Sequence, residues 1–219
     1  MLFEDRSEAG RVLASRLAEF ARRSEVVVLA LARGGVPVGY EVAQALGAPL
    51  DVFVVRNLGT PGQEELAMGA LAPGGVTVLN REVIQALGIS QLTIDAVIAR
   101  EQRELERRER EYRDGRAPLE VAGRTAILVD DGLRTGSSMR VAAKALRKRS
   151  TARIVVAVPV SSPITCAGFE TEVDKVVCAA APEPFWAVGQ WFRNFPDTTD
   201  FEVRELLERA ATPALPPAA

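Results

Sequence analysis

The chain has 219 residues, of which 47% are hydrophobic, so it is long and apolar enough to bury the core of one α/β domain. Its 27 Lys and Arg residues nearly balance its 29 Asp and Glu residues, which excludes a general positive field that would attract nucleic acid or an anionic membrane. The sequence contains no histidine, and this excludes an imidazole base, a Ser-His-Asp triad and a histidine-ligated metal.

The first part of the chain predicts a helix, a buried strand and a second helix. Apolar residues recur at helical spacing over Ser7–Arg22. Val26–Ala32 is apolar at consecutive positions, as in a strand buried on both faces of a parallel sheet. A proline suits the first turn of the next helix, over Pro37–Leu46, and Gly47 is a typical C-terminal stop.

The next segment predicts a strand, a loop and a long helix. Asp51–Arg56 completes a strand-helix-strand unit, whose crossover is right-handed by the general rule. Asn57–Gly75 is rich in Gly and Pro and has little periodicity, which indicates a long mobile loop or a short hairpin. Leu92–Arg113 is highly charged and predicts a long solvated helix.

The second half repeats the strand-loop-helix order. An apolar strand over Thr125–Val129 runs directly into the string DDGLRTGSSM, and further elements are predicted at Arg140–Arg149 (helix), Arg153–Val158 and Lys175–Ala180 (strands) and Phe201–Ala210 (helix). We expect an α/β fold with a mostly parallel, twisted sheet flanked by helices. It forms a single domain over residues 1–210, followed by a flexible, Pro-rich tail over residues 211–219.

Cysteine usage and the N-terminal residues favour a cytoplasmic protein. Cys166 and Cys178 are too few for a zinc cluster and do not suggest the disulfide framework of a small secreted domain, so a reducing setting is the simplest interpretation. The first 13 residues carry charges where a signal peptide needs an apolar core. No window approaches the roughly 18 apolar residues of a membrane span, so we expect no membrane partner.

The strongest chemical signal lies where the third predicted strand ends. Asp130 and Asp131 close this strand, and a small-residue turn then opens a helix. Backbone N–H groups and hydroxyls of this turn can wrap a phosphate, and its glycine lets the backbone approach closely; the residues are Arg134, Thr135, Gly136, Ser137 and Ser138. An ordinary Asp-Gly turn with a helix cap would explain either the two acids or the small-residue turn taken alone. Such a turn does not need two acids, a glycine and three hydroxyls together.

This string resembles the phosphoribosyl diphosphate (PRPP) signature of type I phosphoribosyltransferases, and the order of elements from Val26 to Pro182 is similar too. The resemblance implies a sheet with a small hood, built from both termini, and a mobile flap. It also implies that Asp130 and Asp131 are the catalytic acids, which contact the ribose hydroxyls and meet Mg²⁺ directly, through water or through those hydroxyls. Residues 134–138 would hold the 5′-phosphate, while Mg²⁺ bridges the diphosphate.

A second junction is similar to the diphosphate loop of this family. Arg33, Gly34 and Gly35 follow the first predicted strand, although an ordinary strand-to-helix turn would look alike without the downstream string. A cis peptide near Arg33–Gly34 would agree with the family. Arg56 ends the second predicted strand and would add a cation, but Asn57 stands where relatives commonly have lysine, and this puts that contact in doubt.

The segment at about residues 57–75 looks like the family's flap, which closes over the site and excludes water, although a passive surface hairpin also fits. Arg134 stands where hypoxanthine-type relatives have an acid that serves as a base, and arginine does not serve there. Three alternatives remain: the acceptor arrives anionic or activated, Glu64 or Glu65 of the flap assists, or the acceptor is not that class of purine.

Aromatic residues follow the last predicted strand, where relatives place the hood over the acceptor. Phe185 or Trp186 would stack on a planar base, but core packing or a dimer contact explains clustered aromatics at least as well. The hood is the least patterned part of the resemblance. It leaves open the identity of the nitrogen acceptor, a nucleobase or another amine, and it leaves the oligomeric state open, a homodimer being common in the family.

Other nucleotide-binding classes do not fit. A dinucleotide-binding Rossmann domain needs G-x-G-x-x-G after its first strand, and a P-loop NTPase needs a lysine in its glycine loop. The remaining alternative is a non-catalytic regulatory protein that has the same fold and senses PRPP or a nucleotide. The retained flap and diphosphate loop, and the lack of an appended DNA-binding helix pair, favour an Mg²⁺-dependent phosphoribosyltransferase over this rival.

Overall fold

The structure is a computed structural model that describes residues 2–211. Its centre is a five-stranded, all-parallel sheet in the order β2-β1-β6-β7-β8. The strands are β1 (Val26–Leu31), β2 (Leu50–Phe53), β6 (Thr125–Val129), β7 (Arg153–Val160) and β8 (Lys175–Ala180). The predicted parallel α/β fold is confirmed. Of the predicted tail, Ala211 ends the last helix, and residues 212–219 lie outside the described residues.

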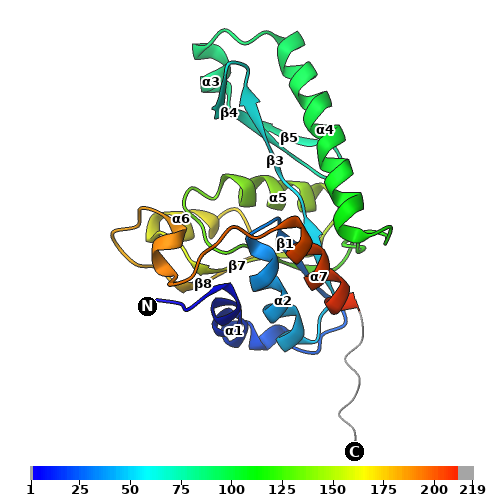
Figure 1. The fold of residues 1–219 in the computed structure, drawn as a ribbon, viewed down its shortest axis with the longest axis vertical. Helices are drawn as coiled ribbons and strands as arrows, with labels where there is room; N and C mark the ends of the chain where they lie inside the picture. Colours follow the sequence, from blue (N-terminus) through cyan, green and yellow to red (C-terminus); the bar gives the residue numbers. More distant parts are fainter. Residues whose placement is uncertain (1, 212–219) are drawn as a thin grey trace, which may run out of the picture.

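Helices cover both faces of this sheet (Figure 1). Apolar residues of α1 (Arg6–Arg16) and α2 (Gly35–Leu46) form one buried cluster with β1, β6 and β7. On the other face, α5 (Ser137–Lys148) and Phe169 of α6 (Pro163–Phe169) pack against the same strands. Two short 3₁₀ turns, Ala18–Phe20 and Val188–Trp191, complete the described helical structure with the helices named below. Burial on both faces explains why these strands are apolar at consecutive positions.

A second, antiparallel sheet contains the short hairpin that was one of the two alternatives predicted for residues 57–75. It contains β3 (Arg56–Thr60), β4 (Gln63–Ala72) and β5 (Val76–Leu79) and projects from the body beside α3 (Arg81–Ala86) (Figure 1). The strand expected over residues 51–56 therefore ends at Phe53, and Arg56 opens the next sheet. The sequence interpretation did not predict β5 or a three-stranded sheet, because β4 carries small residues such as Gly69 and Ala70 and its buried residues run consecutively over 70–72, which hides the period of two.

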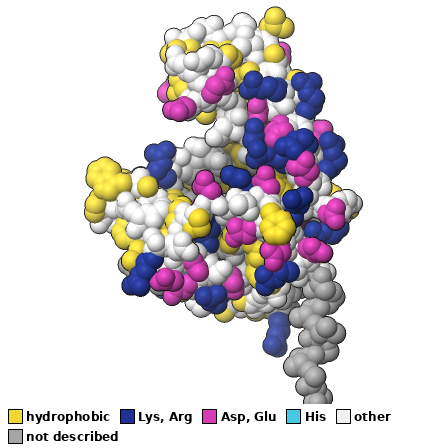
Figure 2. All heavy atoms as spheres, in the orientation of Figure 1, with side chains coloured by type: hydrophobic (Ala, Val, Ile, Leu, Met, Phe, Trp, Pro, Cys, Tyr) yellow, Lys and Arg dark blue, Asp and Glu magenta, His cyan; other side chains and the backbone are white. Residues whose placement is uncertain are grey.

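The long helix α4 (Gln91–Arg113) supports the projecting sheet and is only partly solvated. Ile94, Val97 and Leu105 are buried in a cluster with β3, β4 and α7 (Asp200–Ala211). Figure 2 shows that positive and negative side chains are interspersed over the visible face of the molecule. No helix among the described residues is long and apolar enough to cross a membrane.

The N-terminal segment is bound to the segment that follows β8. Phe3 forms a parallel bridge with Phe192, and its N–H donates to Trp191 O at 2.9 Å. The N–H groups of Arg193 and Asn194 donate back to Phe3 O and Glu4 O, each at 2.9 Å. The first residues of the described chain thus fasten the predicted hood segment to the body of the protein.

Candidate active site

Two loops meet at the carboxyl edge of the main sheet, because β1 and β6 are neighbouring parallel strands with Ala30 opposite Val129. This is the edge at which parallel sheets bind ligands. A cleft of about 370 Å³ opens there. Its lining brings together Arg33 and Gly34 from the first loop and Asp130 and Asp131 from the second, with Arg6, Ala32, Val188, Phe195, Asp197 and Thr198.

Bare glycine backbone allows the two loops to touch. A Cβ on Gly34 would lie 2.2 Å from Asp131 Oδ2, and a Cβ on Gly35 would lie 2.7 Å from Val129 O. Side chains at these positions would push the first loop away from the acids. The peptide bond between Ala32 and Arg33 is cis, one residue before the bond that the resemblance indicated.

Burial disfavours the charged form of both acids. Burial raises the pKa of Asp130 well above its ordinary value, and the charge of Asp131 raises it further. Burial also raises the pKa of Asp131, while the nearby Arg6 guanidinium opposes this shift. The N–H of Asp131 donates to Asp130 Oδ1 at 2.9 Å. Two such carboxyl groups can accept hydrogen bonds from hydroxyl groups or bind a cation.

The loop at residues 134–138 forms the N-terminus of α5. Gly136 precedes the helix with a φ of 72°, a left-handed conformation that glycine adopts readily. The Thr135 and Ser137 hydroxyls lie 3.1 Å apart, and Arg134, Thr135 and Ser137 are exposed, whereas Ser138 is half-buried. Unpaired N–H groups at a helix start attract anions, so this loop has the chemistry of a phosphate cradle.

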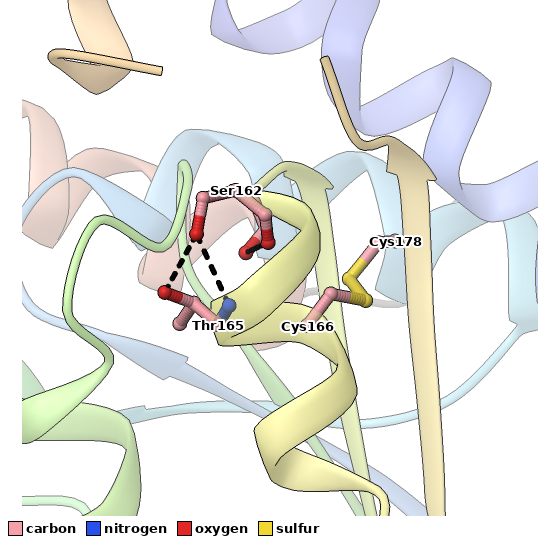
Figure 3. The surroundings of a disulfide bond; sticks show 5 residues. Ser162, Thr165, Cys166 and Cys178 are labelled. Atoms are coloured by element: carbon pink, nitrogen blue, oxygen red, sulfur yellow. Dashed lines mark hydrogen bonds between the residues drawn. A yellow bond between two sulfur atoms is a disulfide. The ribbon is translucent and has the colours of Figure 1, made fainter. Parts of the chain in front are cut away.

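Helix α6 packs against this loop. Thr165 Oγ1 donates to Arg134 O at 2.8 Å, and a Cβ on Gly136 would lie 2.5 Å from the Phe169 ring. A disulfide between Cys166 and Cys178 ties α6 to β8 (Figure 3). The reducing setting inferred from the sequence implied free thiols, so this bond is a departure from that interpretation. No sequence pattern indicated it, because only the fold brings these two Cα atoms to 6.8 Å.

The lining of the acid cleft includes neither the predicted phosphate loop at residues 134–138 nor Arg56, Glu64 and Glu65. Arg56 donates to Glu101 Oε2 from Nε at 2.9 Å and from Nη2 at 2.7 Å, so a carboxylate on α4 holds its guanidinium. Glu64 and Glu65 are exposed on β4, just after the turn at Pro61–Gly62. The segment that was predicted to be the flap forms the antiparallel hairpin of β3 and β4.

The hood aromatics separate into two environments. Phe185 stacks on Trp191 with ring centroids 6.2 Å apart. It lines a shallow cleft of about 620 Å³ with residues 162–165 of the α6 turn and with residues 183–184. Trp186 is 75% exposed. The first aromatic is thus partly used in packing, as the alternative interpretation held, while the second is left at the surface.

Two charged residues that the sequence analysis missed contact the predicted site. Arg6 pairs with Asp131, and Asp200 lies 3.7 Å from Arg33 Nη1. The Tyr112 hydroxyl donates to Asp200 Oδ1 at 2.6 Å, and burial together with this carboxylate raises the pKa of Tyr112 to about 12. No local pattern marks either ion pair, because its partners lie in distant parts of the chain.

A resident metal would depend on the two acids. Among residues 2–211, no group of three His, Cys, Asp or Glu side chains could hold a metal ion by itself. Mg²⁺ needs fewer, because it commonly binds through one or two carboxylates, several waters and the phosphates of its substrate. The buried, mutually repelling carboxylates of Asp130 and Asp131 fit such an ion.

The chain is similar in sequence to known proteins. Residues 5–179 match the family model described as phosphoribosyl transferase domain. Two Mycobacterium tuberculosis proteins, named "Putative phosphoribosyl transferase MT0597" and "Putative phosphoribosyl transferase Rv0571c", are each 47% identical over 209 residues. The match covers 95% of this chain and 47% of each relative, so the chain spans about half the length of these curated relatives.

Solved structures show the same fold. The crystal structure of TT1426 from Thermus thermophilus is 39% identical with a TM-score of 0.81, and the match covers 97% of this chain and all of that one. A hypothetical protein from Neisseria gonorrhoeae with bound ppGpp has a TM-score of 0.51 at 14% identity, with 95% and 98% of the two chains covered. The latter shows a shared fold alone.

Proposed function

The chain belongs to the phosphoribosyl transferase domain family, and we propose that it transfers the phosphoribosyl group of PRPP to a nitrogen acceptor, a nucleobase in the first instance, and releases diphosphate. The observation that carries this proposal is the cleft in which the Arg33–Gly34 loop meets Asp130 and Asp131 at the ends of two parallel strands. An exposed cation, a bare backbone and two acids suit a ligand that carries both phosphates and a polyol.

We assign the donor site as follows. Asp130 and Asp131 accept hydrogen bonds from the ribose hydroxyls, and residues 134–138 hold the 5′-phosphate at the start of α5. Arg33 and the amides of Gly34 and Gly35 meet the diphosphate. Arg56 is a further candidate for the diphosphate, with Glu101 holding its guanidinium.

Mg²⁺ is the proposed cofactor, held by Asp130 and Asp131 directly, through water or through the ribose hydroxyls. When bound, it supplies positive charge to the departing diphosphate. The acids would then lose part of the repulsion that raises the pKa of Asp130 in the free protein.

The protein itself does not need to form or break a covalent bond during the transfer. The bond from C1 to the diphosphate oxygen breaks, a bond from C1 to the acceptor nitrogen forms, and the acceptor gives up a proton where it carries one. Positive charge develops on the ribose in between, so fixed carboxylates beneath the sugar and donors around the leaving group lower the barrier. Such a reaction needs no covalent enzyme intermediate, consistent with a chain that contains no histidine.

For the acceptor we propose Phe185 and Trp186 as stacking residues, and Glu64 or Glu65 as the carboxylates that reach the acceptor when the β3–β4 hairpin closes. Phe185 lines the hood cleft, and both glutamates are solvent-exposed on the hairpin. The organisation that goes with these roles is one domain over residues 1–210, a hood from both termini and a flap over residues 57–75. We place the protein in the cytoplasm, without a nucleic-acid or membrane partner.

The test is release of diphosphate from Mg²⁺-PRPP in the presence of a panel of purines, pyrimidines and simple amines. We expect one class of acceptor to accelerate release by at least about a hundredfold, since positioning alone contributes factors of that size. The matched reaction without acceptor is the control. Saturable PRPP binding without release for any acceptor would contradict an enzyme and leave a PRPP sensor on this fold.

A further inference from the structure

Arg6 is a buried cation at the first turn of α1, and it lines the same cleft as the two acids. The residue is only 8% exposed. Arginine is rarely buried to this extent without partners, because removal of its charge from water is costly. Its partners therefore indicate why this charge is placed here.

Three contacts from two other parts of the chain hold the guanidinium. Nε donates to Asp131 Oδ2 at 2.9 Å, and Nη1 donates to Pro196 O at 2.6 Å. The guanidinium carbon lies 3.7 Å from the centroid of the Phe195 ring, a cation-π contact. Arg6 thus joins the N-terminal helix, the loop after β6 and the hood.

These contacts constrain the Asp131 carboxylate from two sides. Oδ2 lies between Arg6 and the bare backbone of Gly34, where a Cβ would approach it to 2.2 Å. The Arg6 hydrogen bond is to Oδ2 and not to Oδ1. The Oδ2 oxygen of this acid is therefore held by the arginine.

We propose that Arg6 is a positioning residue for the phosphoribosyl donor: it orients the Asp131 carboxylate toward the ribose and links that acid to the hood segment Phe195–Pro196. This inference rests on the proposed function. It also explains why the N-terminal segment and the hood are fastened together beside the donor cleft. A shift of about 1 Å in a positioning group costs up to about a hundredfold in rate.

The first test compares Arg6→Ala with Arg11→Ala, a variant of the same helix. Arg11 makes an exposed 3.4 Å ion pair with Glu41, of a kind that contributes little. We expect Arg6→Ala to raise the PRPP Kd and KM by about tenfold to a hundredfold, with a smaller change in the acceptor KM. Arg11→Ala should match the wild type in all three.

Two conservative variants keep the test open where Arg6→Ala fails to fold. Arg6→Lys retains the charge for Asp131 but does not reproduce the planar stack on Phe195 and the bond to Pro196 O together, so we expect an intermediate PRPP affinity. Phe195→Leu retains the ion pair and should change PRPP affinity less than Arg6→Lys does.

A double-mutant cycle distinguishes positioning from a purely structural role. If Arg6 acts through Asp131, Arg6→Ala should change PRPP affinity less than about twofold in an Asp131→Asn background, although it has a large effect in the wild type. An equal loss in both backgrounds, or wild-type PRPP affinity in folded Arg6→Ala, would overturn the inference. Failure of the wild type itself to bind PRPP would instead overturn the proposed function.

Discussion

Asp130→Asn and Asp131→Asn should each weaken binding of Mg²⁺-PRPP by about tenfold to a hundredfold, and the double variant should show no saturable binding. A hydrogen bond to a charged acceptor contributes about 1.5–3 kcal/mol, and each substitution removes such an acceptor from the ribose and from Mg²⁺. Titration calorimetry measures the affinity, and diphosphate release measures the accompanying loss of turnover.

The loss of PRPP affinity in these variants should not be accompanied by a loss of thermal stability of the ligand-free protein. The folded-state pKa of Asp130 is raised, so at pH 7, above its ordinary pKa, ionisation of this buried acid destabilises the fold. Asparagine removes that charge, and we expect Asp130→Asn to unfold at the wild-type temperature or higher when no ligand is present. A matched control is Asp114→Asn at an exposed, left-handed position with φ 47°, which asparagine also tolerates. Unchanged PRPP affinity in a folded Asp131→Asn would remove this acid from the donor site.

Gly34→Ala should weaken PRPP binding by at least about tenfold, an effect of the size expected when a positioned group is displaced. The new methyl group would lie 2.2 Å from Asp131 Oδ2, and Arg6 on the other side limits the space into which the carboxylate can move. The backbone of Gly34 has φ −57° and ψ −30°, which alanine adopts without strain. The effect therefore comes from the collision alone, and PRPP titration of the purified variant checks it.

Gly47→Ala is the control that separates stability from binding. Gly47 ends α2 with a φ of 63°, and a Cβ there would have no neighbour within 4 Å. Alanine in a left-handed conformation costs about 1–2 kcal/mol, so this variant should melt at a lower temperature. It should nevertheless bind PRPP as the wild type does. Equal affinity of Gly34→Ala and wild type would show that the two loops are not in contact during binding.

The parallel core and the donor loops could be predicted because their signals are local. β6 was predicted with its observed bounds, Thr125–Val129, since a strand buried on both faces reads as a short apolar run. The string that follows it carries its own turn and helix start, so both the loop and α5 follow from neighbouring residues. That this loop lies beside Arg33–Gly34 depends on the pairing of β1 with β6, which the structure shows and no local pattern predicts.

The contacts that complete the site could not be predicted, because they join distant parts of the chain. Arg6 and Asp131 are 125 residues apart, and Arg56 meets Glu101 across two different elements. A lone arginine in an amphipathic helix has no local mark that distinguishes it from a solvated one. The projecting sheet was likewise hidden by its small residues, and the disulfide depends on the approach of α6 to β8.

The most direct measurement is a calorimetric titration of PRPP into the wild-type protein, with and without Mg²⁺, before any acceptor is added. We expect saturable binding of PRPP at a single site per chain, which requires Mg²⁺ and for which inorganic diphosphate competes. Absence of binding by the folded wild-type chain would contradict the proposed donor site, and only the family and the fold would then remain.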